Sequence, residues 1–291
     1  MTDKIEYNIK SSYDYNWDPT WFHCVKYDSA LINAISQFQK SQDIKPDGMC
    51  GPITLQKKYP ERLSQIQKHE TNFLIFGGNP IPLKWDRVET YLDDSKWKSK
   101  YYNSEIGEKR RDIKYLVNHW DVTLSASHCH KILNSPKRGL SCHLYIDNDG
   151  TIIQTTDLQN ITYHAGSRRW NRDSIGVEIS NAFYPKWQKY YLSRGLPPRD
   201  VIKNAFVHGQ KLESHLGFYP VQKEALRALY VAIQKGLGIP LQTPSIKTIH
   251  PDSIEGNYRG LIHHYHLTRN KIDSGSYDIQ EQIDIIKKNK S

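Results

Sequence analysis

Several features of common protein classes are missing from this chain. No stretch approaches the roughly 18 uninterrupted apolar residues of a membrane-spanning helix, and the first residues, MTDKIEYNIKSSYDYNW, lack the apolar core of a signal peptide. The four cysteines show no paired CxxC spacing, so we expect reduced, mostly buried thiols rather than a disulfide framework. No internal repeat is visible. We therefore expect no stable membrane insertion, and a protein acting outside a cytoplasm would need another route of release.

The composition is that of a globular protein with an anionic partner. Hydrophobic residues make up 37% of the 291 residues and charged residues 24%, which is enough to bury a core, and the length suggests two domains. The net charge of +9 favours nucleic acid, an anionic membrane or a polyanionic cell wall. No nucleic-acid-binding motif occurs, and the lysines are scattered rather than interleaved with aromatic residues. We therefore expect no nucleic-acid partner.

The N-terminal part has the pattern of a compact helical module. The segment 29–40 predicts a helix, and the following IKPDGMCGPITLQKKY alternates turn residues with apolar anchors. The apolar positions of these two segments are Ala30, Ile35, Phe38, Ile44, Ile53 and Leu55. A helix ending in FQ, followed by a DG-x-x-G-x-x-T turn, resembles the peptidoglycan-binding domain family over roughly residues 25–65. The matching positions are Phe38, Gln39, Asp47, Gly48, Gly51 and Thr54. The motif identifies the module, residues 1–75, but not its contact residues, because Asp-Gly and Gly-Pro suit turns in any protein.

The rest of the chain reads as a linker and a second domain. Residues 76–110 begin with the loop-like FGGNPIPLKW and lack apolar periodicity, so we expect a linker and approach to a domain over 111–291. From residue 113, IKYLVNHW, DSIGVEISN and RGLIHHYHL predict strands, SASHCHKILNS a helix, and SCHLYIDNDGTIIQTT a hairpin turning at Asp149-Gly150. PVQKEALRALYVAIQKGLG predicts an amphipathic helix ended by Gly236 and Gly238. The long segment 183–220 is either a substrate-recognition loop or a scaffold insertion.

Histidines and carboxylates in the second domain predict a metal site. Hydrolysis of an unactivated amide at neutral pH needs a nucleophile better than water, and zinc held by three protein ligands supplies one. His119 closes the first strand of the domain, and HHYHLTRNKID near the C-terminus offers histidines followed by Lys271 and Asp273. Histidine with carboxylate is a donor set that catalytic zinc sites use.

Five sequence blocks resemble a known family. YLVNHW, SCHLYIDNDGTIIQ, YHAG, SIGVEISN and HHYHLTRNKIDSG occur in the order and at the spacing of zinc amidases of the N-acetylmuramoyl-L-alanine amidase type, relatives of phage lysozyme-amidases and of peptidoglycan recognition proteins. The resemblance covers residues 113–275. It implies that His119 is the first zinc ligand, that a histidine of the last block is the second, and that Asp273 is the third, where other members use Cys.

The identity of the second ligand stays open between two histidines. The family places an apolar residue three positions after this ligand, which is Leu267 counted from His264 but His266 counted from His263. Against that, the ten-residue separation from His263 to Asp273 equals the separation in some relatives. The pattern favours His264, keeps His263 as the alternative, and makes His266 the weaker candidate.

The resemblance also implies catalytic residues. Glu178 matches the catalytic glutamate, a carboxylate that takes a proton from the attacking water and passes it to the leaving amine. Its neighbours Val177 and Ile179 predict a buried opposite face, so Glu178 must face a polar region or a cleft. Lys271 matches the residue that stabilises the oxyanion of the tetrahedral intermediate.

Four further positions follow from the matched blocks. Some relatives carry a tyrosine where this chain has Cys142, which shifts the catalytic weight onto Glu178. His143 is expected to be an interior histidine rather than a ligand. His164 of YHAG resembles a substrate-contacting cleft residue, and the basic Arg168 beside it can meet carboxylates of the stem peptide.

Together these patterns predict an α/β (α+β) fold with a mixed central β-sheet flanked by helices, a zinc site at one edge, and a small N-terminal three-helix domain. The implied activity is hydrolysis of the amide between N-acetylmuramic acid and L-alanine in bacterial peptidoglycan, with one zinc ion and a monomeric protein. The alternative is a non-catalytic peptidoglycan recognition protein, which would have lost a ligand or the base. The arrangement resembles a phage endolysin, made in a host cytoplasm and released to the wall, although a bacterial wall-recycling enzyme or a delivered effector has the same chemistry.

Overall fold

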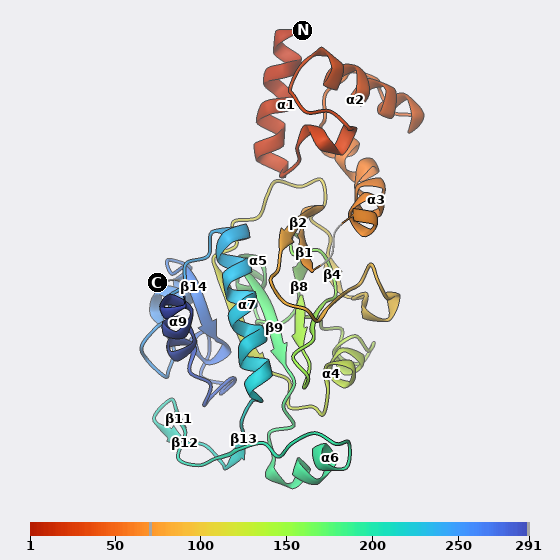
Figure 1. Ribbon diagram of the computed structural model, residues 1–291. Coiled ribbons are helices and arrows are strands. Elements are labelled where there is room, and N and C mark those ends of the chain that lie inside the picture. Colours follow the sequence, from red (N-terminus) through yellow and green to blue (C-terminus); the bar gives the residue numbers. More distant parts are fainter. Residues whose placement is uncertain (70–71, 290–291) are drawn as a thin grey trace. The chain divides into compact units, whose positions relative to one another are not determined.

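The computed structural model describes residues 1–69 and 72–289, and the chain divides into two compact units. Unit 1 comprises Met1–Ile81, Asn103–Arg111 and Asp157–Ile161, and unit 2 comprises Pro82–Tyr102, Asp112–Thr156 and Thr162–Ser291. Figure 1 shows helices dominating the first unit and a sheet with flanking helices in the second. The chain passes between the units after Ile81, Tyr102, Arg111, Thr156 and Ile161, and two of these crossings fall within the two-residue strands β4 (Tyr102–Asn103) and β8 (Ile161–Thr162).

Three helices and a 3-10 turn build most of unit 1. They are α1 (Thr2–Tyr15), η1 (Pro19–Phe22), α2 (Ser29–Ser41) and α3 (Pro52–His69). Helix α2 confirms the predicted helix, and it begins where the Asp28 carboxylate accepts the backbone N–H groups of Ala30 and Leu31. The buried core comprises Trp17, Trp21, Phe22, Leu31, Ile35, Cys50 and Leu55. Two of the expected apolar anchors, Ala30 and Ile53, are instead exposed. Leu31 rather than Ala30 is buried on α2, and Ile53 on α3 is 62% exposed.

The FQ and DG-x-x-G-x-x-T residues of unit 1 hold one another in place. The buried Gln39 side chain lies with Nε2 3.0 Å from Asp47 Oδ1, from the Met49 carbonyl and from Thr54 Oγ1, while its Oε1 accepts the Gly48 N–H at 2.8 Å. Gly48 has φ 74°, and a Cβ there would lie 2.6 Å from Ile32 Cγ2, so only glycine fits. These motif residues therefore maintain the turn after α2.

Residues 73–103 contain strands where a loop and linker were expected. β1 (Phe73–Phe76) and β2 (Asn79–Pro82) form a two-stranded sheet around Gly77 and Gly78, whose φ values of 57° and 76° suit a tight hairpin turn. β3 (Val88–Thr90) is an edge strand of the central sheet of unit 2 and is followed by the 3-10 turn η2 (Ser95–Trp97). Strands of two to four residues, one of them with two prolines, are too short to show a periodicity of two.

A six-stranded mixed sheet forms the centre of unit 2, as predicted. Its order is β14-β5-β9-β6-β7-β3. The strands not yet described are β5 (Tyr115–Trp120), β6 (Leu144–Ile146), β7 (Ile152–Gln154), β9 (Ser174–Ile179) and β14 (Gly260–His263). β6 and β7 form the predicted antiparallel hairpin, whereas β5 runs parallel to both β14 and β9. The carboxyl ends of β14, β5 and β9 therefore lie side by side.

Helices cover the sheet of unit 2. The long helix α7 (Pro220–Leu237) contacts α9 (Ile279–Lys288), and both lie in front of the sheet in Figure 1. Gly238 follows α7 with φ 70° as the expected helix end, whereas Gly236 lies inside the helix. The predicted helix α4 (Ala126–Leu133), capped by Ser125, packs Ala126 against Tyr145 of β6. Unit 2 also contains α5 (Arg168–Asp173), α8 (Pro251–Glu255) and the 3-10 turn η4 (His264–His266).

The segment after β9 folds into short elements. They are η3 (Pro185–Trp187), α6 (Gln188–Leu192), β10 (Val201–Ile202), β11 (Phe206–Val207), β12 (Gln210–Lys211) and β13 (His215–Leu216). β11 pairs with β12, and β10 pairs with β13, both antiparallel. The segment 183–220, expected to be either a substrate-recognition loop or a scaffold insertion, thus contains two small antiparallel ribbons.

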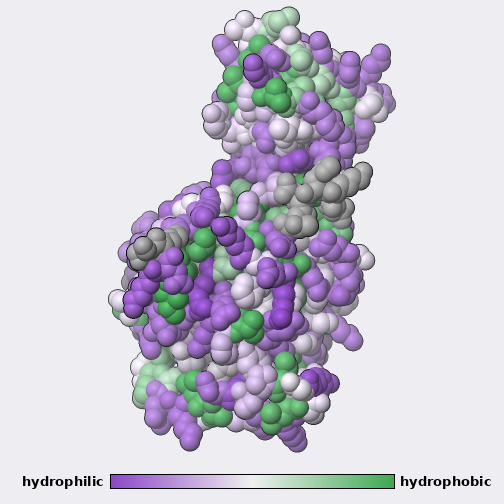
Figure 2. Space-filling model, in the orientation of Figure 1, coloured by the Kyte–Doolittle hydropathy of each residue, from purple (hydrophilic) through white to green (hydrophobic). Residues whose placement is uncertain are grey.

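The surface and the thiols agree with the composition. None of the helices in the described residues is both long and apolar enough to cross a membrane. Figure 2 shows hydrophilic residues over most of the visible face of each unit. The four cysteines are unbridged, and Cys50, Cys129 and Cys142 are buried while Cys24 is half-buried, which confirms the expected reduced thiols.

Candidate metal centre

Strand β5 places His119 on one face of the sheet. All six residues of β5 are buried, and side chains alternate along a strand, so Tyr115, Val117 and His119 share a face. Tyr115 and Val117 pack there with Ile262 of β14 in an apolar cluster. His119 therefore presents its imidazole just beyond a rigid apolar layer, at the carboxyl end of the strand.

The register between β14 and β5 separates the two candidate histidines. Ile262 pairs with Val117 and His263 pairs with Asn118, so His263 lies on the face opposite His119. The His263 ring stacks on Tyr265, and its Nδ1 lies 2.8 Å from Ser274 Oγ. His264 is the next residue, in the turn η4, and its ring centroid lies 4.5 Å from that of His119.

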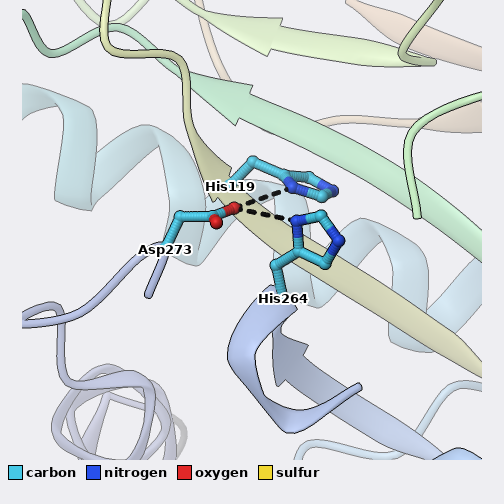
Figure 3. Close-up of side chains that lie close together, drawn as sticks. All are labelled: His119, His264 and Asp273. Atoms are coloured by element: carbon cyan, nitrogen blue, oxygen red, sulfur yellow. Dashed lines mark hydrogen bonds and ion pairs between the residues drawn. The ribbon is translucent and has the colours of Figure 1, made fainter. Parts of the chain in front are cut away.

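Asp273 completes a group of three buried donors (Figure 3). Its Oδ2 lies 3.0 Å from His119 Nδ1 and 3.1 Å from His264 Nδ1, and the potential ligand atoms all lie within 4.8 Å of one another. Around a tetrahedral zinc ion with bonds of about 2.0–2.1 Å, neighbouring donors lie about 3.3 Å apart. Two imidazoles and one carboxylate at this spacing fit zinc and leave a fourth coordination position for water or substrate.

The protonation states suit metal binding. Burial and the neighbouring His264 lower the pKa of His119 to about 4, despite the adjacent Asp273, so His119 is neutral at pH 7. Burial alone would raise the pKa of Asp273, but His264 and His119 outweigh it and hold this pKa below its ordinary value. A neutral imidazole and an ionised carboxylate are the forms that coordinate a metal ion.

Glu178 lies beside His119 on the neighbouring strand. The β5–β9 register pairs His119 with Glu178, so both side chains are on the same face of the sheet, while Val177 and Ile179 are fully buried on the other face as predicted. Within the described part of the chain, Glu178 Oε2 is buried and accepts no hydrogen bond. Burial, with the negative charges of Asp121 and Asp273, raises the pKa of Glu178 well above its ordinary value. A half-buried carboxylate with one buried oxygen and a raised pKa is a group suited to proton transfer.

His164 contacts the metal-site histidine directly. Its Nδ1 lies 3.1 Å from His119 Nε2, and its Nε2 lies 3.2 Å from Ser174 Oγ. A Cβ on Gly176 would lie 2.5 Å from His164 Nδ1, so the glycine of the SIGVEISN block makes room for this ring. With His119 Nδ1 directed to the donor cluster, the hydrogen bond at Nε2 fixes the orientation and tautomer of His119.

The other residues expected at the site lie in different surroundings. Lys271 is exposed, and its charge opposes the larger effect of burial on the pKa of Glu178. Arg168 is exposed in the first turn of α5, and no contact joins it to the donor cluster within the described residues. His143 is fully buried, with Nδ1 accepting the Gly176 N–H at 3.2 Å, and is thus an interior histidine as expected.

Several contacts that hold the site have no signal in the sequence. The Lys271 carbonyl accepts a hydrogen bond from His208 Nε2 at 2.9 Å, and Ser274 contacts His263. Tyr230 of α7 donates to Asn118 Oδ1 at 2.7 Å beneath the strand that carries His119. These partners are 11 to 112 residues apart in the sequence, and no motif or periodicity connects them.

Comparison with known proteins identifies the family. Residues 109–276 match the N-acetylmuramoyl-L-alanine amidase family, and because the match spans more than half of the chain, the chain belongs to this family. Its enzyme class is accordingly that of the N-acetylmuramoyl-L-alanine amidases. No curated protein sequence matches the chain significantly.

Solved structures with a related arrangement have low sequence identity. A selenomethionine derivative of AmpD is 16% identical, with 70% of this chain and 95% of that chain covered and a TM-score of 0.40. AmiD from E. coli, in complex with anhydro-N-acetylmuramic acid-L-Ala-D-gamma-Glu-L-Lys, is 19% identical over 65% and 66% of the two chains, with a TM-score of 0.39. The Ph2119 endolysin of a Thermus scotoductus MAT2119 bacteriophage is 13% identical over 68% and 97%, with a TM-score of 0.40.

Proposed function

We propose that this protein is a zinc-dependent amidase that hydrolyses the bond between N-acetylmuramic acid and L-alanine in bacterial peptidoglycan. The observation that carries the proposal is the convergence of His119, His264 and Asp273 next to Glu178. A protein that only recognises the wall would not need three converging donors together with a carboxylate that has a buried oxygen and a raised pKa. The family to which the chain belongs supports the same reaction class.

His119, His264 and Asp273 are the proposed metal ligands. A bound zinc ion would supply Lewis-acid activation of water and of the scissile carbonyl. Burial keeps His119 neutral, and His164 holds its ring in one orientation. Asp273 supplies the negative charge that partly neutralises the cation.

Glu178 is the proposed general base and acid. Its carboxylate takes a proton from the attacking water while the water oxygen bonds to the amide carbon, and it then delivers that proton to the nitrogen of L-alanine as the carbon–nitrogen bond breaks. A nearby cation lowers the pKa of Glu178 from its raised value and favours the ionised form that the first step needs. Lys271 is the proposed stabiliser of the negative oxygen that develops between these steps.

His164 and Arg168 are proposed to bind substrate. Contact with His119 supports this role for His164, in addition to its support of the ligand ring. The exposed guanidinium of Arg168, four residues after His164, can pair with carboxylates of the stem peptide.

Residues 1–75 are proposed to form a wall-binding module, because the FQ and DG-x-x-G-x-x-T residues are assembled in unit 1 as one turn. The net charge of +9 suits a polyanionic wall. A wall-binding module joined to an amidase supports a lytic role like that of an endolysin, made in a host cytoplasm and acting at the wall.

The decisive experiment treats purified peptidoglycan with the protein and identifies the new ends by mass spectrometry. We expect intact stem peptides with free L-alanine amino groups, lost upon chelation and restored by zinc. Glu178→Gln, which keeps the side-chain size, is the matched variant and should still bind zinc without releasing peptides. Binding of zinc-replete protein to peptidoglycan without any new ends would leave only the recognition function.

A further inference from the structure

A tight hairpin in the long insertion carries a histidine at an unusual backbone position. β11 and β12 pair Phe206 with Lys211 and Val207 with Gln210, which leaves His208 and Gly209 as a two-residue turn. Their φ values are 54° and 74°, as a type I′ turn requires. Asparagine followed by glycine is the usual pair in this turn. Histidine also tolerates a positive φ, and at this position it directs an imidazole ring away from the turn backbone to other segments.

Both ring nitrogens of His208 are used. Nε2 lies 2.9 Å from the carbonyl oxygen of Lys271, and because a carbonyl only accepts, the Nε2–H donates. Nδ1 lies 2.9 Å from Thr248 Oγ1, whose hydroxyl can donate to it. The two contacts together fix the plane of the ring. His208 thus anchors the chain at Lys271 to a residue of a third segment.

The anchored residue belongs to the loop that carries the proposed ligand Asp273. Lys271 and Ile272 are exposed, and the backbone bonds within the loop run from the Lys271 N–H to the Thr268 carbonyl at 3.4 Å and from the Gly275 N–H to the Ile272 carbonyl at 2.8 Å. Such a loop holds its own shape weakly. Its position near His119 therefore depends on contacts with other elements.

The insertion also contacts this loop after Asp273. His215 Nε2 lies 2.8 Å from Ser276 Oγ, and a Cβ on Gly275 would lie 2.7 Å from Leu212 Cδ1. In addition, His208 meets the edge of the Tyr265 ring, and the Tyr265 N–H donates to the Asp273 carbonyl at 3.2 Å. The insertion thus contacts the loop before Asp273, at Lys271, and after it, at Gly275 and Ser276.

We infer that the β11–β12 hairpin is a brace for the metal-binding loop and that His208 is its positioning residue. His208 does not touch the reacting atoms; it fixes the backbone from which Lys271 and Asp273 project. The effect on catalysis rests on the proposed function, whereas the effect on the loop itself does not. A loop that is already ordered in the metal-free protein binds the ion more tightly, because less conformational entropy is lost on binding.

His208→Asn is the sharpest test, because asparagine suits the turn but is too short to reach the Lys271 carbonyl. In zinc-free protein we expect amide hydrogen exchange at residues 271–275 to rise about threefold to tenfold, the loss expected for one hydrogen bond. Zinc affinity, measured by chelator competition, should fall by a similar factor. The kcat should fall while KM changes little. The thermal unfolding temperature should stay unchanged, whereas replacing a residue that only stabilises the fold would lower it.

Two further variants bracket this result. His208→Gln carries an amide N–H at a longer reach and should restore part of the protection, whereas Lys211→Gln, an exposed change in the same hairpin, should alter neither exchange nor zinc affinity. Unchanged exchange and zinc affinity in His208→Asn would overturn the brace. If His208→Asn instead disturbs the hairpin, His208→Gly decides, since glycine suits the positive φ of the turn and removes the whole side chain; wild-type loop protection in that variant would also overturn the brace. Absence of amidase activity in the wild type would overturn the proposed function and leave the exchange result intact.

Discussion

The polar motif residues of unit 1 and those of unit 2 differ in how far their side-chain atoms are hydrogen-bonded. In unit 1, the buried Gln39 bonds to Asp47, Thr54 and the backbone, so its polar groups are used by the fold. In unit 2, Glu178 keeps a buried oxygen without a partner, and its pKa is raised. A motif residue whose polar atoms are all hydrogen-bonded stabilises the fold. A motif residue with an unpartnered buried oxygen and a shifted pKa is suited to proton transfer.

The largest expected effect lies in unit 2. Glu178→Gln should lower kcat about 100- to 10,000-fold, the range for loss of a general base, because no other carboxylate pairs with His119 across the sheet in the described residues. Thermal stability should stay the same or rise, since the native carboxylate is buried without a hydrogen bond at Oε2. Steady-state kinetics and thermal denaturation check the two halves. A loss of stability with normal kcat in Glu178→Gln would mean that Glu178, like Gln39, stabilises the fold and does not take part in the chemistry.

The two adjacent histidines should separate into a ligand and a structural residue. His264→Ala should abolish stoichiometric zinc binding, because it removes one of three donors within 4.8 Å. His263→Ala should keep one zinc ion per chain but lower stability by about 2–3 kcal/mol, because it removes the Tyr265 stacking and the contact with Ser274. Metal analysis after dialysis and denaturant unfolding distinguish the outcomes. The opposite pattern would make His263 the ligand.

Acid should weaken unit 2 more than unit 1. Burial lowers the pKa values of His119, His130 and His266 to about 4 from an ordinary value of 6.5. Between these pH values the unfolded chain binds protons that the folded chain does not, so stability is full above pH 7 and falls as the pH drops from 6.5 to 4. Glu178 and Asp121 oppose part of this loss, because burial raises their pKa values, to about 7 for Asp121, and the folded protein takes up their protons first. We expect a net loss on the order of a few kcal/mol in zinc-free protein. Hydrogen exchange at pH 7 and pH 5 should show unit 2 opening first; equal opening of both units would contradict this.

The smallest effect is expected in unit 1. Gln39→Leu should cost about 1–3 kcal/mol of stability, because Asp47, Thr54 and the Gly48 N–H lose a partner. The rate on a soluble muropeptide fragment should stay within about twofold, since no atom of the proposed site changes. Lys40→Ala, an exposed change on the same helix, serves as the control. A large loss of kcat in folded Gln39→Leu would mean that the residue is not merely structural.

The elements that the sequence predicted are those with a clear period. β5, β9, the β6–β7 hairpin and α7 all repeat apolar residues at strand or helix spacing, and all are present. A three-helix domain was predicted, but the position of helix α1 was not, because its buried face is polar: Asn8 exchanges hydrogen bonds with Gly48 and Cys50, partners about forty residues away. No local periodicity can reveal a face that is buried through distant hydrogen bonds.

The candidate site was predictable in its membership but not in its arrangement. The matched blocks named His119, Glu178 and Asp273, and the structure brings them to one end of the sheet. The choice between His263 and His264 depends on which residue of β14 pairs with Asn118, and strand register is a long-range property. The support from His208 was invisible for the same reason.

The sequence separation of 154 between His119 and Asp273 has a consequence for how the protein matures. The two donors meet only when β14 and the loop after it dock beside β5, a non-local pairing that forms slowly compared with local helices. A chain emerging from the ribosome can fold α1 to α3 long before its last ligand has been synthesised. Under the proposed function, hydrolysis can therefore begin only after the C-terminal segment has been made and has docked beside β5.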